Sequence, residues 1–317
     1  MIPDQIRTVL EDPGFATGLL TGSLALAAGA LVILLWPRSS QPSVVPLAGL
    51  LLAGAGALAL RDQGQLPGGL GLGLFLLALA GFSAGVAART PVAPAAVHAV
   101  LAAPGAWLLT GAADLDGTWP PLLLVGAIAL GGALTGAADH SYRKLALGPV
   151  LSLVSLAGVY TTVPDTERAL VVLGAAVPLA VLGWPLALAT LGRAGASATV
   201  GLLAWVAVTD GSARPGSVVG AIACLGILLV EPVARTLRGQ EPPDPSPDAA
   251  VVDRDPAGWR LAMPVILAHL ALVAVAARVA GLRTDALESA AIAGFALVTA
   301  VFLAAQWPRL LPLIGEG

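Results

Sequence analysis

The sequence predicts an all-α protein, a polytopic integral membrane helix bundle with about ten or eleven transmembrane helices. Of its 317 residues, 57% are hydrophobic and only 11% are charged, whereas a soluble domain carries about 25% charged residues. Long apolar runs recur along almost the whole chain, and about 20 apolar residues are enough for a helix to cross a hydrocarbon core of about 30 Å. A chain with so few charges is expected to face lipid.

The apolar runs divide into eleven candidate spans, joined by connections that are mostly short, so consecutive helices should be antiparallel neighbours. They are too long for the strands of a membrane β-barrel and lack the alternation of apolar and polar residues that such strands show. The second run is rich in glycine and the eighth is short, so a count of ten stays open. The candidate spans are residues 15–36, 43–60, 67–88, 91–111, 118–138, 145–163, 168–191, 194–209, 216–235, 260–281 and 286–307.

The first residues are expected to form a short helix at the membrane surface. No basic segment precedes the first apolar run, so a cleavable signal is not predicted. A helix here would place four apolar side chains on one face, as interfacial helices do. These side chains are Ile2, Ile6, Val9 and Leu10.

The basic residues predict the orientation. With eleven spans, ten of the 16 Lys and Arg residues fall on the side that follows odd-numbered helices, and six fall on the other side. The more basic side should be cytoplasmic, which places the N-terminus outside and the C-terminus inside the plasma membrane of a bacterial cell. The expected partner is the lipid bilayer, and the net charge of −3 gives no reason to expect nucleic acid.

One segment interrupts the apolar pattern. Residues 236–259 are rich in proline and aspartate, which predicts a disordered cytoplasmic linker. The chain would then comprise a membrane bundle of about nine helices in residues 1–235, the linker, and two C-terminal transmembrane helices in residues 260–317. A docking or phosphorylation role for the linker stays an alternative to a simple spacer.

Small residues four apart predict close helix packing. The pairs are Gly18 with Gly22, Gly69 with Gly73, and Gly132 with Gly136. Such patterns let the backbones of membrane helices approach each other. We interpret them as contacts within the chain, with dimerisation as the alternative.

Three ionisable side chains form a candidate intramembrane polar site: His98, His269 and Glu231. Ionisable groups at membrane depth are costly and often functional. On the predicted topology, both histidines lie about 10–14 Å above the cytoplasmic helix ends, where they could relay protons or contact a substrate. The structural alternative is that each imidazole bonds a nearby helix, and that Glu231 pairs with Arg235 one helical turn later.

A second candidate site is the loop that follows the fifth span. It contains His140, Tyr142, Arg143 and Lys144. Basic cytoplasmic loops commonly contact anionic lipid headgroups, so we predict headgroup contact here, with phosphate binding as the alternative.

Prolines mark the spans that could line a cavity. Broken or kinked helices expose backbone groups that bind substrates in transporters, although neighbouring helices also tolerate prolines as simple kinks. The best candidates are the fourth span, with Pro94 and Pro104, and the seventh, with Pro178 and Pro185.

No motif indicates catalysis, a metal or a cofactor. The single cysteine, Cys224, excludes a thiol-based metal site, and residues Gly195 to Ala198 share only part of the serine motif of intramembrane proteases. We therefore expect no cofactor and no metal, and favour a protein that is not an enzyme. The first hypothesis is a transporter of a small molecule, lipid or lipid-linked sugar, since the length and helix count are similar to those of drug/metabolite carriers. The alternatives are a non-catalytic membrane subunit or scaffold, and a lipid-modifying membrane enzyme.

Overall fold

The computed structural model describes nine helices and several shorter pieces of the chain. The longer described ranges are 4–35, 45–87, 94–113, 148–162, 167–183, 188–211, 267–276 and 286–314, with single residues at 125, 128, 186, 224, 226, 230, 237, 278 and 279. Throughout these ranges the chain is helical or connecting, and no strand occurs. The prediction of an all-α protein is confirmed.

The helices follow the predicted spans closely, and each of the eleven candidate spans contains helical residues. Among the described helices, α2 is long and apolar enough to cross a membrane by itself, and several shorter apolar helices accompany it. The helices are α1 (Asp4–Glu11), α2 (Pro13–Leu35), α3 (Ala48–Asp62), α4 (Leu70–Ala87), α5 (Pro94–Ala112), α7 (Gly148–Thr162), α8 (Glu167–Gly183), α9 (Arg193–Gly211) and α13 (Ala286–Ile314).

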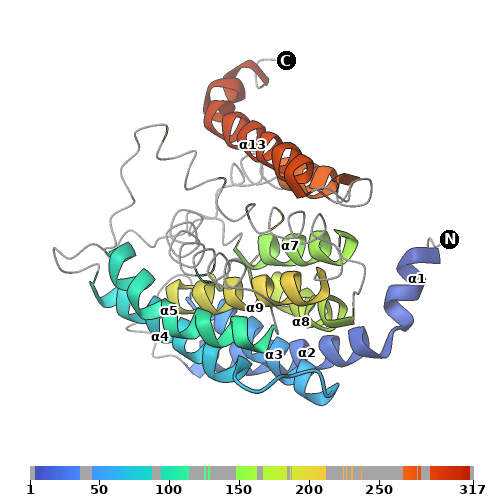
Figure 1. Ribbon diagram of the computed structural model, residues 1–317, viewed down its shortest axis with the longest axis vertical. Coiled ribbons are helices and arrows are strands. Elements are labelled where there is room, and N and C mark those ends of the chain that lie inside the picture. Colours follow the sequence, from blue (N-terminus) through green and yellow to red (C-terminus); the bar gives the residue numbers. More distant parts are fainter. Residues whose placement is uncertain are drawn as a thin grey trace.

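Helices α8 and α9 form the centre of the bundle (Figure 1). Helix α8 packs against α2, α3 and α7, and α9 packs against α3 and α4. Both central helices are buried along most of their length, including Trp205 of α9, which is 1% exposed. Because neighbours surround α8 and α9, their side chains form the interior of the protein, whereas α2, α4 and α5 each present an outward face.

Glycines bring α2 and α8 into backbone contact. A Cβ added to Gly18 would overlap the backbone of Val171, one added to Gly22 would overlap that of Ala175, and one added to Gly174 would meet the carbonyl of Phe15. The prediction that Gly18 and Gly22 serve packing within the chain is confirmed, because their contacts lie on a neighbouring helix of the same molecule.

Close backbone contacts at glycines also join two further helix pairs. Gly49 of α3 lies against the backbone of Gly195 in α9, and Gly73 of α4 lies against Gly105 of α5. Helices that approach this closely gain dispersion contacts that larger side chains would prevent. The predicted pair Gly132 and Gly136 lies outside the described residues.

The seventh predicted span ends earlier than expected. Helix α8 stops at Gly183, and residues 188–191 are not helical, whereas the prediction continued the helix to 191. Proline disfavours helical geometry at the preceding residue and lacks an N–H, so Pro185 accounts for the break. The non-helical segment pairs in parallel with Val45, whose N–H donates to Leu188 O at 3.0 Å and whose carbonyl accepts from Thr190 N at 3.0 Å.

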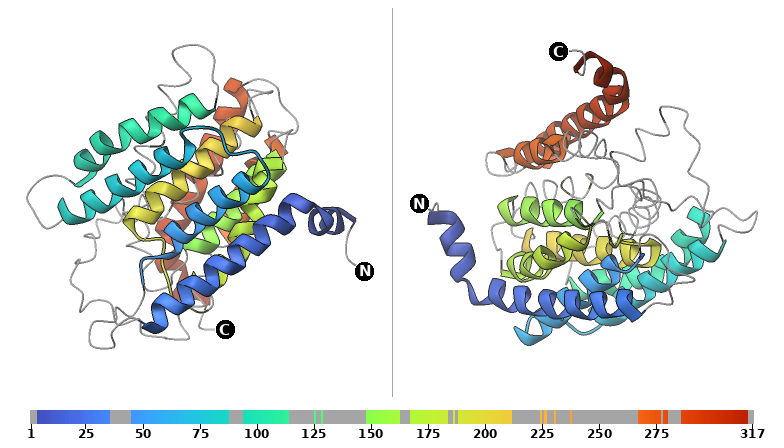
Figure 2. Two further views of the ribbon diagram at one scale, coloured as in Figure 1. Left: turned by 90° about the horizontal axis from the view of Figure 1, so that it is seen from below. Right: turned by 180° about the vertical axis from the view of Figure 1, so that it is seen from behind.

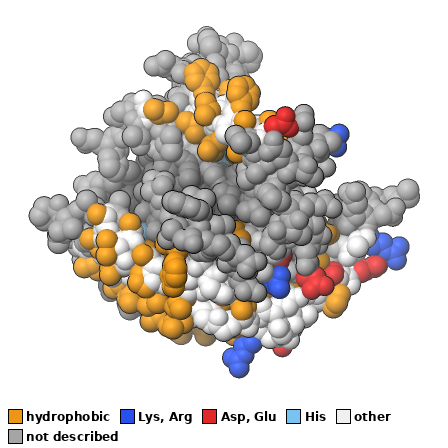
Figure 3. Space-filling view, in the orientation of Figure 1, with side chains coloured by type: hydrophobic (Ala, Val, Ile, Leu, Met, Phe, Trp, Pro, Cys, Tyr) orange, Lys and Arg blue, Asp and Glu red, His pale blue; other side chains and the backbone are white. Residues whose placement is uncertain are grey.

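The outward faces of the bundle are strongly apolar. Figure 3 shows hydrophobic side chains gathered over the region of α4 and α5 and again on α13. On α4 an exposed stripe recurs every three or four residues, which places it on one helical face. The stripe consists of Leu72, Phe75, Leu79, Phe82 and Val86.

Helix α13 lies at the edge of the molecule, away from α2 and α3 (Figures 1 and 2). Its inner face contacts the second half of the chain, where Leu297 approaches Gly226. Its outer face exposes Phe295, Val298 and Phe302 to 59–75%. The predicted linker 236–259 lies outside the described residues, apart from Leu237.

Candidate functional site

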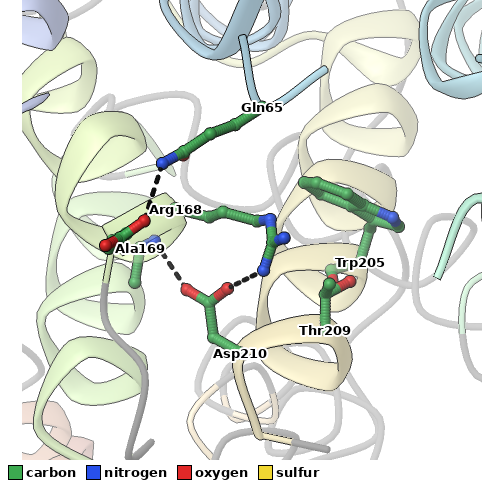
Figure 4. Close-up of polar contacts among 7 residues, drawn as sticks. Gln65, Arg168, Ala169, Trp205, Thr209 and Asp210 are labelled. Carbon is green, nitrogen blue, oxygen red and sulfur yellow. Dashed lines mark hydrogen bonds and ion pairs between the residues drawn. The ribbon is translucent and has the colours of Figure 1, made fainter. Parts of the chain in front are cut away.

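A buried ion pair joins the beginning of α8 to the end of α9 (Figure 4). Arg168 Nη1 donates to Asp210 Oδ1 at 3.1 Å, and the Asp210 side chain is completely buried whereas that of Arg168 is 31% exposed. Asp210 Oδ2 also accepts from the backbone N–H of Ala169 at 2.9 Å. The carboxylate therefore both neutralises the guanidinium and caps the first turn of α8, where the helix dipole favours a negative charge.

Two further contacts extend this cluster. The Arg168 guanidinium lies over the indole of Trp205, with Cζ 5.9 Å from the ring centroid, which adds a cation–π attraction. Beside it, Gln65 Nε2 donates to Glu167 Oε2 at 3.0 Å. The indole N–H of Trp205, the Nε–H of Arg168 and the Gln65 carbonyl oxygen are buried without a hydrogen-bond partner among the described residues, so the cluster retains two spare donors and one spare acceptor.

The cluster also shows which connections between helices lie at the same end of the bundle. The predicted loops after the second, sixth and eighth spans should lie on one side of the membrane, and Gln65, Glu167 and Asp210 come from these three places. The structure brings them to one end of the bundle. The proximity of these three residues agrees with the prediction that consecutive helices are antiparallel. It does not depend on which side of a membrane this end of the bundle faces.

Sequence reasoning missed the role of this cluster. Glu167, Arg168, Trp205 and Asp210 were not among the site residues predicted from the sequence. In the structure, Glu167 begins α8, Arg168 is partly buried, and Trp205 belongs to the interior. A carboxylate at the end of an apolar run, at Asp210, was the signal that could have been used, because a charge there needs a partner.

A second polar contact lies deeper in the bundle, between α5 and α9. His98 Nε2 is 2.9 Å from Ser197 Oγ, and the two residues are 2% and 0% exposed. Since the hydroxyl can donate or accept, either tautomer of the imidazole is accommodated. Of the three predicted intramembrane residues, His98 therefore has an interhelical hydrogen-bond partner on the central helix.

His269, the second predicted histidine, is 1% exposed and lies in the helical residues 267–276. That segment lies beside α13, apart from α5 in both views (Figure 2). The structure therefore does not bring the two histidines together as a relay. Glu231 and the loop residues His140, Tyr142, Arg143 and Lys144 lie outside the described residues.

The predicted cavity-lining prolines have separate positions. Pro94 begins α5, where a missing N–H costs nothing, and Pro104 lies inside α5 on its exposed side. Pro178 is buried inside α8. Pro185 lies outside the described residues. The residues that follow it, 188–190, pair through their backbone with Val45.

Several other buried hydroxyls donate to backbone carbonyls of neighbouring helices or of their own. Thr199 Oγ1 donates to Gly49 O at 3.2 Å, which links α9 to α3. Ser155 Oγ of α7 donates to Cys224 O at 3.1 Å. Such bonds satisfy polar groups that would otherwise be buried unpaired.

Comparison with known proteins gives no assignment. No protein-family pattern matches the chain, and no characterised protein matches it. Within the described residues, no cluster of three or more His, Cys, Asp or Glu side chains could hold a metal ion. Neither comparison therefore identifies a family for this chain.

Proposed function

We propose that the chain is a multi-pass membrane protein that carries a small, hydrogen-bonding solute or a lipid-linked sugar across the bilayer. The observation that carries the proposal is an inverted distribution of polarity. Large apolar side chains face outward from α2, α4 and α5, whereas His98, Ser197 and Asp210 are buried between helices. A soluble protein rarely exposes apolar faces of this extent.

The membrane part of the proposal rests on the outward faces. Leu20, Leu24 and Leu34 of α2 are 63–79% exposed, and Phe75 and Phe82 of α4 are 62–63% exposed. Lipid tails solvate such side chains without cost, and the helices satisfy their own backbone groups, as a bilayer requires. Charged side chains, by contrast, concentrate near helix ends such as Arg61, Asp62 and Glu167.

The transport part rests on the buried contacts. The His98–Ser197 hydrogen bond joins two helices inside the bundle, and a solute with its own hydroxyl or carbonyl groups could compete for the same partners. The connection between α8 and α9 includes a non-helical segment that pairs with Val45, and non-helical backbone inside a bundle is a feature that transporters use around a substrate. Among the described interior residues, Asp210 is the one carboxylate and it already pairs with Arg168, so a neutral solute is favoured over an ion.

Two measurements test the proposal separately. Single-tryptophan variants that retain either Trp107, which is 58% exposed, or Trp205, which is 1% exposed, are reconstituted in vesicles containing brominated lipid. Strong quenching of Trp107 and weak quenching of Trp205 is expected in a bilayer. Equal quenching, or a chain that stays monodisperse in buffer without detergent, would remove the membrane part.

Transport is tested by uptake into proteoliposomes. Radiolabelled neutral sugars, polyols and a lipid-linked sugar are supplied outside, with Ser197→Ala as the comparison and protein-free vesicles as the control. Uptake that requires the protein and falls in Ser197→Ala supports the proposal. No protein-dependent uptake across this panel would count against transport and leave the membrane assignment intact.

A scaffold is the second candidate, and one observation favours it. The outer face of α13 exposes the stripe of Phe295, Val298 and Phe302, which would fit a partner membrane helix as well as lipid. A stoichiometric partner that co-purifies from native membranes, and that is lost from a Phe295→Ala/Phe302→Ala variant, would favour the scaffold.

A further inference from the structure

We infer that the chain contains two parallel copies of one helical unit, residues 13–112 and 167–279. We further infer that the His98–Ser197 contact is a solute-binding position at the boundary between them. The second part rests on the proposed transport function, and the first part does not. In each copy the structure describes a first helix, a non-helical connection to a second helix, and, later in the chain, a helical segment that carries a buried histidine, His98 or His269.

The helix contacts show the parallel relation. Along α2 and α8 the partners advance in the same direction, from Gly18 with Gly174 to Gly29 with Leu182. Along α3 and α9, Gly49 meets Gly195 and Gly56 meets Leu202, and in each case the partners are 146 residues apart in the sequence. The crossovers before these helices pair in the same sense, as the parallel bridge from Val45 to Ala189 shows.

Sequence elements recur at nearly the same spacing. The pattern Asp-x4-Pro-Gly closes the second helix of each copy, beginning at Asp62 and at Asp210, which are 148 residues apart. Trp36-Pro37 and Trp184-Pro185 end the first helices at the same spacing of 148. Trp-Pro also occurs at residues 119 and 307, so the dipeptide alone does not indicate a duplication. The evidence is the common spacing of 148 residues and the equivalent positions after the first helices.

The next two spans continue the correspondence. Arg89-Thr90 and Arg235-Thr236 each follow an apolar run and are 146 residues apart. Beyond them, His98 and His269 each follow a proline by four or five residues and are 171 residues apart. The spacing grows by 25 residues between these two pairs of positions, where the Pro- and Asp-rich residues 237–259 of the second copy intervene, so an insertion there accounts for most of the change.

The boundary between the copies passes through the buried polar contacts. His98 belongs to the first copy and Ser197 to the second, and Thr199 of the second copy donates to Gly49 O of the first. His98 and Ser197 both lie in the second helical turn, since each is the fifth residue of its helix. Transporters place substrate sites at the interface between repeats. A hydrogen bond between two neutral side chains suits a neutral solute with hydroxyl or carbonyl groups, which could replace either partner.

The two copies differ at the end where α8 begins. Asp62 of the first copy is exposed, and its helix α2 is instead capped by Asp12, which accepts from Gly14 N at 2.8 Å. Asp210, its equivalent, is buried against Arg168. The ion-pair cluster is thus a feature of the second copy alone, which makes the copies functionally distinct at that end.

Cysteine accessibility tests the parallel arrangement in the full-length chain. In a Cys224→Ser background, single cysteines replace Gln63 or Gly211 near one pair of equivalent ends, and Ser39 or Ala187 near the other. Membrane-impermeant maleimide should label 63 and 211 from one face of sealed vesicles and 39 and 187 from the opposite face. If the two members of either pair are labelled from opposite faces, the parallel duplication is wrong.

Spin labels test the equivalence of the histidine helices. Ala99→Cys and Leu270→Cys flank His98 and His269, are 171 residues apart, and lie at outward-facing positions. Equivalent positions should give bilayer depths within about one helical turn, 5.4 Å. Depths that differ by more than two turns would overturn the correspondence.

The solute-binding position has its own readout. His98→Ala and Ser197→Ala should each lower the apparent affinity for a transported sugar by about tenfold or more, with Thr209→Ala at the far end of α9 as the matched control. Unchanged affinity in both variants would remove the binding position. Because labelling and depth do not depend on transport, a failure of the proposed function is distinguishable from a failure of the duplication.

Discussion

The carboxylate of Asp210, in the last turn of α9, holds the guanidinium of Arg168 in the first turn of α8 at 3.1 Å. A helix end and a helix start that are more than 40 residues apart are thereby fixed to each other. The equivalent aspartate of the first copy, Asp62, is exposed, which offers a matched control for the value of this contact.

We expect Asp210→Asn to lower stability by about 1–3 kcal/mol, because the buried hydrogen bonds to Arg168 and Ala169 are weakened and the guanidinium loses its counter-charge. Thermal unfolding in detergent, followed by tryptophan fluorescence, measures the change. Asp62→Asn should leave the midpoint unchanged. Equal effects of the two substitutions would show that the ion pair contributes nothing specific.

Backbone contact between α3 and α9 predicts sensitivity at one glycine of α3 and tolerance at another. An added Cβ at Gly49 would overlap Gly195, whereas at Gly54 it meets nothing within 4 Å. Gly49→Ala should cost about 1–3 kcal/mol through overpacking, and Gly54→Ala should change stability little or raise it slightly through helix propensity. The unfolding midpoints of the two variants are compared. If Gly49→Ala does not lower the midpoint, the close approach of α3 to α9 at Gly195 is contradicted.

The turn before α9 predicts a similar contrast. Gly192 and Gly64 both have positive φ, at +70° and +67°, but only Gly192 would also place a Cβ against the backbone of Pro46. Each alanine substitution should cost about 1–2 kcal/mol for the left-handed conformation. Gly192→Ala should cost more because of the overlap. Chemical unfolding of both variants measures the difference, and an equal loss would show that the crossover can shift.

The His98–Ser197 hydrogen bond predicts energetic coupling between α5 and α9. Each of His98→Ala and Ser197→Ala leaves one buried polar group unpaired, whereas the double variant removes both. The double variant should therefore be more stable than the sum of the single losses predicts, with a coupling energy of about 0.5–3 kcal/mol. Additive losses in a double-mutant cycle would show that the two side chains do not interact.

The apolar stripe on α4 predicts that charge is excluded from it. Phe75, 63% exposed near the middle of α4, should tolerate Leu but not Arg, since a charge at the centre of a membrane helix costs about 2.5–3.5 kcal/mol. The fraction of chain that resists alkaline extraction from membranes measures insertion. Gln63→Arg, in the connection after α3, is the control that should insert normally, and equal insertion of Phe75→Arg would place α4 away from lipid.

Hydropathy was sufficient to locate the helices, because a run of apolar residues long enough to fill a bilayer leaves few other structures. It failed at the end of the seventh span, where residues 188–191 remain largely apolar but are not helical. Apolar character does not distinguish a helix from an extended segment that pairs with a distant one, and the proline at 185 was the local signal.

The polar contacts were predictable only in part. His98 stood out as a histidine in an apolar run, yet nothing local in the sequence identified Ser197 as its partner, because serine is frequent in membrane helices and the two are 99 residues apart. Asp210 and Trp205 were not predicted as site residues, although Asp210 directly follows the apolar run of residues 194–209. Their burial follows from the neighbours of α9, which local patterns do not encode.

The pairing of Val45 with Ala189 sets an order of events during synthesis. The amide and carbonyl of Val45 bond to Leu188 and Thr190, which leave the ribosome more than 140 residues later. At a synthesis rate of about 5–20 residues per second, the amide and carbonyl of Val45 lack these hydrogen-bond partners for roughly 7–30 s. We therefore expect water or an insertion factor to bond these two groups of Val45 temporarily, after α2 and α3 have been synthesised and until α8 and α9 follow.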